Sequence, residues 1–162
     1  MRMVVLLLLL LLAALVAGLS AGAATAALPN RLVIKFTSIT AQKKGTPSCP
    51  AGVVLVQGRS RAGGAARARL CLLDQKKIAT NTKAITSKAT IRVAGFSGRL
   101  EALVRIVEVS KGGVSHRTIT GIIYPGAGAF AHAGGRVFGT GTISFPKQGA
   151  PKVNLTFGFA FD

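Results

Sequence analysis

Acidic residues are scarce in this chain. Its 162 residues include 21 lysines and arginines but only four carboxylates, Asp74, Glu101, Glu108 and Asp162. This excludes a paired-carboxylate motif, and the sequence also has no Ser/His/Asp order and no phosphate-binding loop. The net charge of +17 produces instead a field that attracts polyanions such as acidic glycans, teichoic acid, nucleic acid or lipid headgroups. No catalytic motif is predicted.

Aromatic side chains are also few, with no tryptophan and a single tyrosine, Tyr124. The one local basic cluster, Arg59, Arg61, Arg67 and Arg69, contains no aromatic residue that could stack on the bases of a single strand. A specific nucleic-acid partner is therefore not expected, and a transmembrane barrel with aromatic girdles is disfavoured. Two interpretations of the charge stay open: a solvated basic surface, or one that binds an anionic surface polymer.

Cysteine occurs only twice, at positions 49 and 71. Two thiols alone make a poor metal site, and no metal or other cofactor is predicted. In a secreted protein an even number favours a disulfide, which would close a loop of about 22 residues. If a hairpin turns at Gly63-Gly64, Cys71 lies opposite Val56 and not Cys49. The bridge then requires either an earlier turn or a crossing from the loop that precedes the strand.

The N-terminus has the three parts of a secretory signal peptide. Arg2 is followed by an apolar run over residues 3–17 and by small residues up to position 27. We therefore expect a helical signal peptide over 1–27 and one mature domain over 28–162, exported to an extracellular or periplasmic space. The uncharged stretch is also long enough for an uncleaved membrane anchor, which remains the alternative.

The remaining sequence has a period of two and no helical period, which predicts an all-β domain. The final segment, 152–162, has apolar residues at its odd positions and would aggregate as an exposed edge. Pairing it with the first strand would cover it, so we favour a closed antiparallel barrel over a sandwich. Gly139 and Gly141 inside a strand fit the coiling of a small barrel. Seven to nine short strands are expected, at 32–37, 53–57, 67–73, 85–94, 100–110, 114–124, 136–145 and 152–162, with a less regular segment at 78–83. Residues 74–77 are predicted to form a turn.

Residues 118–142 contain a glycine-rich hairpin in which Gly128-Ala129-Phe130 and Ala133-Gly134-Gly135 are prominent. This pattern resembles the hairpin of dirigent proteins and allene oxide cyclases. The resemblance implies an eight-stranded barrel with a hydrophobic cavity for a small molecule, often in a dimer or trimer. It also implies either a cyclase or a template that steers a reactive intermediate. Glycines allow positive φ in the turn, and Phe130 is expected to lie beneath it as a plug.

Five residues are candidates for lining that cavity. His116 and Tyr124 share one face of a strand, and an inward histidine could act as an acid or base near neutral pH. Glu101 and Arg105 share a face of the preceding strand, and Phe130 completes the set. The alternatives are ion pairs across strands with surface lysines or arginines for the charged residues, and an exposed position at a strand end for His116.

These observations favour a secreted, basic β-barrel that acts as a non-catalytic ligand-binding or structural module. One alternative is a cyclase-like or dirigent-like enzyme that steers a hydrophobic intermediate in the cavity. The other is a polyanion-binding protein at the cell envelope. Whether the protein is an enzyme is left open by the sequence.

Overall fold

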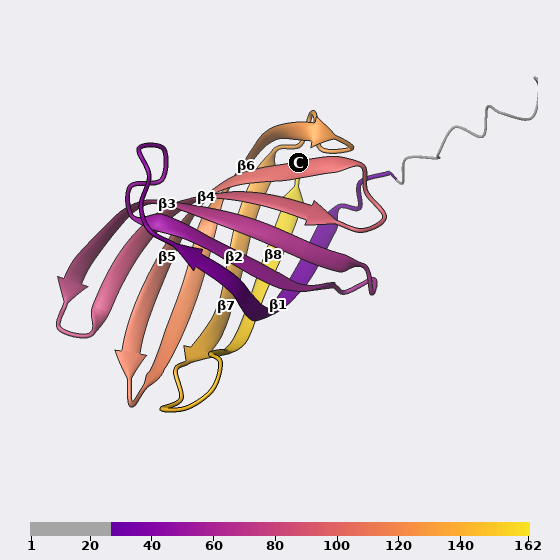
Figure 1. Cartoon of the computed structure of the whole chain (residues 1–162). Helices are drawn as coiled ribbons and strands as arrows, with labels where there is room; N and C mark the ends of the chain where they lie inside the picture. Colours follow the sequence, from indigo (N-terminus) through magenta and orange to yellow (C-terminus); the bar gives the residue numbers. More distant parts are fainter. Residues whose placement is uncertain (1–26) are drawn as a thin grey trace, which may run out of the picture.

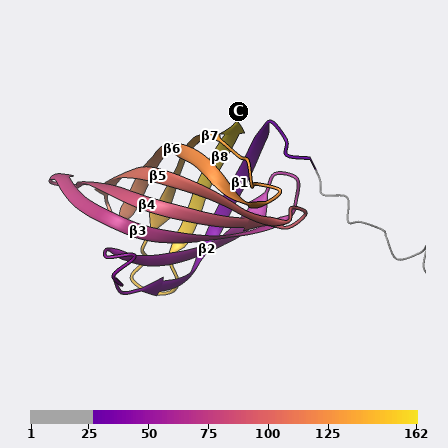
Figure 2. The same cartoon turned by 90° about the horizontal axis from the view of Figure 1, so that it is seen from above.

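A computed structural model describes residues 27–162, so that nearly all of the expected signal peptide lies outside the described residues. The chain forms a closed antiparallel barrel in which each strand pairs with the next and β8 pairs with β1 (Figures 1 and 2). The all-β fold and its closure between the last and first strands are as predicted. The strands are β1 (Arg31–Lys43), β2 (Gly52–Ser60), β3 (Ala65–Ala79), β4 (Thr82–Val93), β5 (Gly98–Lys111), β6 (Val114–Gly128), β7 (Gly135–Ser144) and β8 (Lys152–Phe161).

The third strand is longer than the sequence suggested. Residues 74–77 were predicted to form a turn, but β3 continues through them and the chain reverses at Thr80 and Asn81. A register shift between Leu72 and Asp74 marks where the apolar part of β3 gives way to its exposed part. The polar composition of this segment reflects exposure to solvent on a projecting hairpin. Composition alone does not distinguish an exposed strand arm from a turn.

Phenylalanines fill one end of the barrel. Phe36 and Phe157 pack edge to face with their centroids 5.3 Å apart, and Phe159 continues the row. Phe130 lies fully buried under the β6–β7 turn, with its ring centroid 5.6 Å from that of Phe96. The prediction of a plug at Phe130 is confirmed, because buried side chains close this end. The C-terminus lies at the same end (Figure 1).

Glycine is required where the plug turn meets the neighbouring β4–β5 connection. Gly128 has φ of +63°, and a Cβ there would lie 2.6 Å from the carbonyl oxygen of Ser97. Both the left-handed conformation and the close approach exclude a larger residue. The turn that holds Phe130 in place therefore depends on this glycine.

A disulfide joins Cys49 to Cys71, as predicted. The β2–β3 hairpin turns earlier than Gly63-Gly64, so Cys71 pairs in register with Val53 and not with Val56. Cys49 lies in the loop before β2, so the bridge combines the two alternatives, an earlier turn and a link from that loop. Both sulfurs lie on the outer side of the barrel wall in a small apolar cluster with Val53, separate from the interior core. The bridge fastens the β1–β2 loop to β3, and it is compatible with an oxidising compartment such as the extracellular space or periplasm.

A search of residues 27–162 for a helix of sufficient length and apolar character to cross a membrane found none.

Candidate ligand pocket at the open end of the barrel

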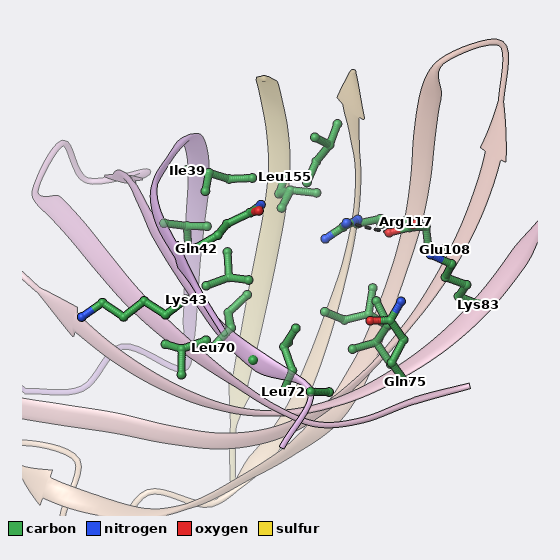
Figure 3. Close-up of a pocket in the computed structure, with 18 of the residues that line it drawn as sticks. Ile39, Gln42, Lys43, Leu70, Leu72, Gln75, Lys83, Glu108, Arg117 and Leu155 are labelled. Carbon is green, nitrogen blue, oxygen red and sulfur yellow. Dashed lines mark hydrogen bonds and ion pairs between the residues drawn. The ribbon is translucent and has the colours of Figure 1, made fainter. Parts of the chain in front are cut away.

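The end of the barrel opposite the Phe130 plug is hollow. It contains a pocket of about 350 Å³ (Figure 3). The β1–β2 loop and the β3–β4, β5–β6 and β7–β8 connections lie at this end of the barrel (Figure 1). Aliphatic side chains from most strands make up much of its wall, with charged and amide side chains among them. The apolar lining includes Ile39, Val54, Val56, Leu70, Leu72, Ile85, Ile106, Ile143, Phe145 and Leu155. We call this space the mouth pocket.

A row of charged residues crosses one wall of the mouth pocket. In the strand register, Lys83 of β4 lies opposite Glu108 of β5, and Glu108 lies opposite Arg117 of β6. The next residue in the row is Gly141 of β7, which has no side chain to cover the guanidinium. Because side chains of the same row point to the same side of a sheet, Lys83, Glu108 and Arg117 gather at one place.

Glu108 and Arg117 form the ion pair of this pocket, with 2.6 Å between the Glu108 Oε2 and the Arg117 Nη2. Their side chains are only 12% and 17% exposed, so solvent screens the pair less than it screens a surface pair. Burial lowers the pKa of Arg117, and the charge and hydrogen bond of Glu108 oppose that shift. The guanidinium remains a cation, since arginine titrates far above neutral pH.

The mouth pocket carries more positive than negative charge. Glu108 is the only carboxylate in its lining, whereas Lys43, Lys83 and Arg117 all belong to it. Figure 3 shows the amide of Gln42 directed toward the pocket and the Lys43 ammonium directed away from it. The described residues contain two ion pairs, Arg99–Glu101 and Arg117–Glu108. Of the two cations in the row, Lys83 is therefore the one that forms no ion pair with Glu108.

Two of the predicted cavity residues, His116 and Tyr124, lie on the outer face of the barrel and not in the mouth pocket. In β6 the inward positions are the odd ones, with Ser115, Ile119 and Ile123 buried. The shared face of His116 and Tyr124 was correctly recognised, but it is the face that points outward. The alternation of threonine and isoleucine along β6 does not by itself indicate which face is inside.

Glu101 and Arg105 are likewise on the outside, because β5 buries its even positions. Glu101 accepts hydrogen bonds from Arg99 at 2.7 Å and from the Thr90 hydroxyl at 3.0 Å. Glu101 therefore forms an ion pair on the outer face, as the alternative interpretation expected, but its partner Arg99 lies on the same strand and not on a neighbouring one. Phe130, the fifth candidate, is buried in the closed end and does not line the mouth pocket.

The ion pair in the mouth was missed from the sequence, although a signal for it was present. The sequence Lys111-Gly112-Gly113 predicts a tight turn. A hairpin that reverses at the two glycines places Glu108 opposite Arg117. Opposite charges at facing positions would then have indicated a contact. Whether this contact lies inside or outside the barrel depends on whether the odd or the even positions of β5 point inward. The sequence does not show this, because β5 has apolar residues on both faces.

Tyr124 is the only tyrosine of the chain, so that its titration can be followed without interference. Its hydroxyl is buried, and its pKa is raised first by burial and second by the charge of Glu101, which lies on the neighbouring strand. The unfolded chain therefore ionises first, and stability is expected to fall as pH rises above about 10. Ultraviolet absorbance of the phenolate should show a midpoint above the ordinary tyrosine value.

A Glu101→Gln variant should lower that midpoint but leave it above the ordinary value, since burial remains. A Glu108→Gln variant, whose change lies inside the barrel, should not alter it. A midpoint at the ordinary tyrosine value in the native protein would contradict the prediction.

Comparison with known protein families, with curated proteins and with solved structures found no match for this chain. The resemblance to dirigent proteins and allene oxide cyclases therefore stays a prediction. Within residues 27–162 the search for three or more clustered histidine, cysteine, aspartate or glutamate side chains also found no candidate metal site.

Proposed function

We propose that this protein is a secreted, non-catalytic barrel that binds a small amphipathic anion in its mouth pocket. The observation that carries the proposal is the combination of an aliphatic wall with the Lys83–Glu108–Arg117 row. An apolar tail would fill the space among the aliphatic side chains, and a carboxylate or similar head would contact Lys83 and the open side of Arg117. Ligand pockets of proteins combine apolar walls with a few polar groups in this way.

The size of the pocket limits the ligand. A volume of about 350 Å³ is near the lower end of small-molecule sites, which suits a medium-length chain or a single ring system and not a large lipid. The closed, phenylalanine-filled end prevents a longer chain from passing through the barrel. The ligand is thus expected to enter tail first and to leave its anionic head near the rim.

Straight-chain carboxylates offer a direct test by titration calorimetry. Affinity should rise about fourfold for each methylene group added to octanoate, because each buried methylene contributes about 0.8 kcal/mol, until the pocket is full. Octanol and an octyl ammonium ion, which share the tail but lack the negative head, should bind more weakly. Equal affinities for octanoate, octanol and the octyl ammonium ion would contradict the proposal. An affinity that does not change with the length of the tail would also contradict it.

Variants of the charged row should shift the affinity for decanoate in opposite directions. Glu108→Gln removes the carboxylate that competes for Arg117 and should tighten binding. Lys83→Gln removes an attractive charge and should weaken it about two- to fivefold, as expected for a partly exposed ion pair. Lys76→Gln, on the exposed arm of β3, serves as the control and should leave the affinity unchanged.

Catalysis in the barrel receives less support than binding. His116 and Tyr124, the groups that would have supplied acid–base chemistry, lie outside the barrel. Among the described residues, those that line the mouth pocket include no histidine, serine, cysteine or tyrosine. Glu108, the remaining candidate, is held by Arg117.

A further inference from the structure

Three arginines lie together on the outer face of the barrel, away from the mouth pocket. Arg67 and Arg69 occupy successive outward positions of β3, and Arg92 of β4 lies directly opposite Arg67 in the register. All three line a shallow groove of about 430 Å³, together with Gln57 of β2 and Thr90 of β4, among others. We call Arg67, Arg69 and Arg92 the arginine face.

No carboxylate of the described residues neutralises the arginine face. The two ion pairs of residues 27–162 involve Arg99 and Arg117, and Glu101, the nearest acidic residue in register, is already bound to Arg99. Like charges at directly opposed positions of a sheet are destabilising, so the Arg67–Arg92 pair has a cost in the free protein. Oxyanions that bridge the guanidinium groups would remove that cost.

The geometry points to a linear polymer as the ligand, with oxyanions spaced along it. Two outward positions on one strand are about 7 Å apart, and facing residues on paired strands are about 5 Å apart. Guanidinium groups bind sulfate and carboxylate oxygens through two parallel hydrogen bonds. The arginine face therefore presents three such donors over a short distance, as a chain of repeated anionic units requires.

We propose that the arginine face binds an acidic polysaccharide. A single-stranded nucleic acid is disfavoured because the groove is lined by Thr40, Leu55, Gln57 and Thr90, with no aromatic side chain for bases to stack on. The polar hydroxyl and amide groups beside the arginines match the hydroxyl-rich surface of a glycan. The disulfide beside the face, to whose Cys49 sulfur Arg69 donates at 3.5 Å, suits an extracellular partner.

Heparin, a sulfated polysaccharide, is the probe for this proposal. Binding of the intact protein should weaken steeply with added salt, because each anion–arginine contact releases counterions. The double variant Arg67→Gln/Arg92→Gln should bind about tenfold more weakly than the native protein, as two partly exposed charge contacts imply. Thermal unfolding of each variant verifies that it is folded.

The control removes the same charge from the opposite wall. Arg136→Gln/Lys152→Gln changes two exposed residues of β7 and β8, so any loss it causes measures the effect of net charge alone. Equal losses for the two double variants would overturn the proposal. Tighter binding of single-stranded DNA than of heparin at the same salt concentration would overturn the assignment to a polysaccharide. Decanoate binding in the mouth pocket should be unaffected by either change.

Discussion

Replacing Phe130 with alanine should lower the free energy of unfolding by about 3–5 kcal/mol, the usual loss for a fully buried phenylalanine. The ring fills the closed end between Phe96 and Phe161, with centroid separations of 5.6 and 6.3 Å. The turn above it is held by glycines and backbone hydrogen bonds, which limits its collapse into the space left behind. For a domain of this size the melting temperature should fall by about 10–18 °C, as measured by calorimetry.

Two variants test whether the loss comes from the packing of the plug. Phe130→Leu should recover more than half of the lost stability, since it restores most of the buried apolar volume. Phe145→Ala removes a ring that is 53% exposed at the other end and should change stability by less than about 1 kcal/mol. If Phe130→Ala and Phe145→Ala were equally stable, the closed end would not depend on the plug.

The closure of the barrel could be predicted because β8 is too apolar to remain as an exposed edge strand. Five apolar residues at alternate positions of β8 had to be covered, and the structure covers them by pairing β8 with β1. The plug was expected on a different ground, the resemblance of the glycine-rich hairpin around Phe130 to that of dirigent proteins and allene oxide cyclases. The structure buries this ring completely.

The pocket could not be predicted in the same way, because its charged residues could lie either on the outer face of the barrel or on its inner face. Glu101 and Glu108 lie on the same strand and both form an ion pair with an arginine, one outside and one inside the barrel. Their sequence neighbourhoods differ little, and only the closed register decides between them. The hairpin at Gly112-Gly113 fixed which residues face each other but not which side they face.

Removing the disulfide should destabilise the protein by about 3 kcal/mol, because Cys49 and Cys71 close a loop of 22 residues in the unfolded chain. The double variant Cys49→Ala/Cys71→Ala avoids leaving a free thiol, and its melting temperature should fall by about 10 °C. The native protein treated with dithiothreitol provides the comparison, since its thiols still occupy the outer apolar cluster. A difference in melting temperature between the double variant and the reduced native protein measures the packing of the two sulfurs. The decrease that both proteins share measures the contribution of the cross-link.

The same bridge should also influence the mouth pocket. It fastens the β1–β2 loop to β3, and Lys43, Ala51 and Gly52 at the ends of that loop belong to the pocket lining. Reduced protein, kept well below its lowered melting temperature, should therefore bind decanoate more weakly than oxidised protein. Heparin binding should change less, because Arg67 and Arg92 are anchored by strand pairing and not by the loop. Unchanged decanoate affinity after reduction would show that strand pairing alone holds the loop against the pocket, and that the cross-link acts only on stability.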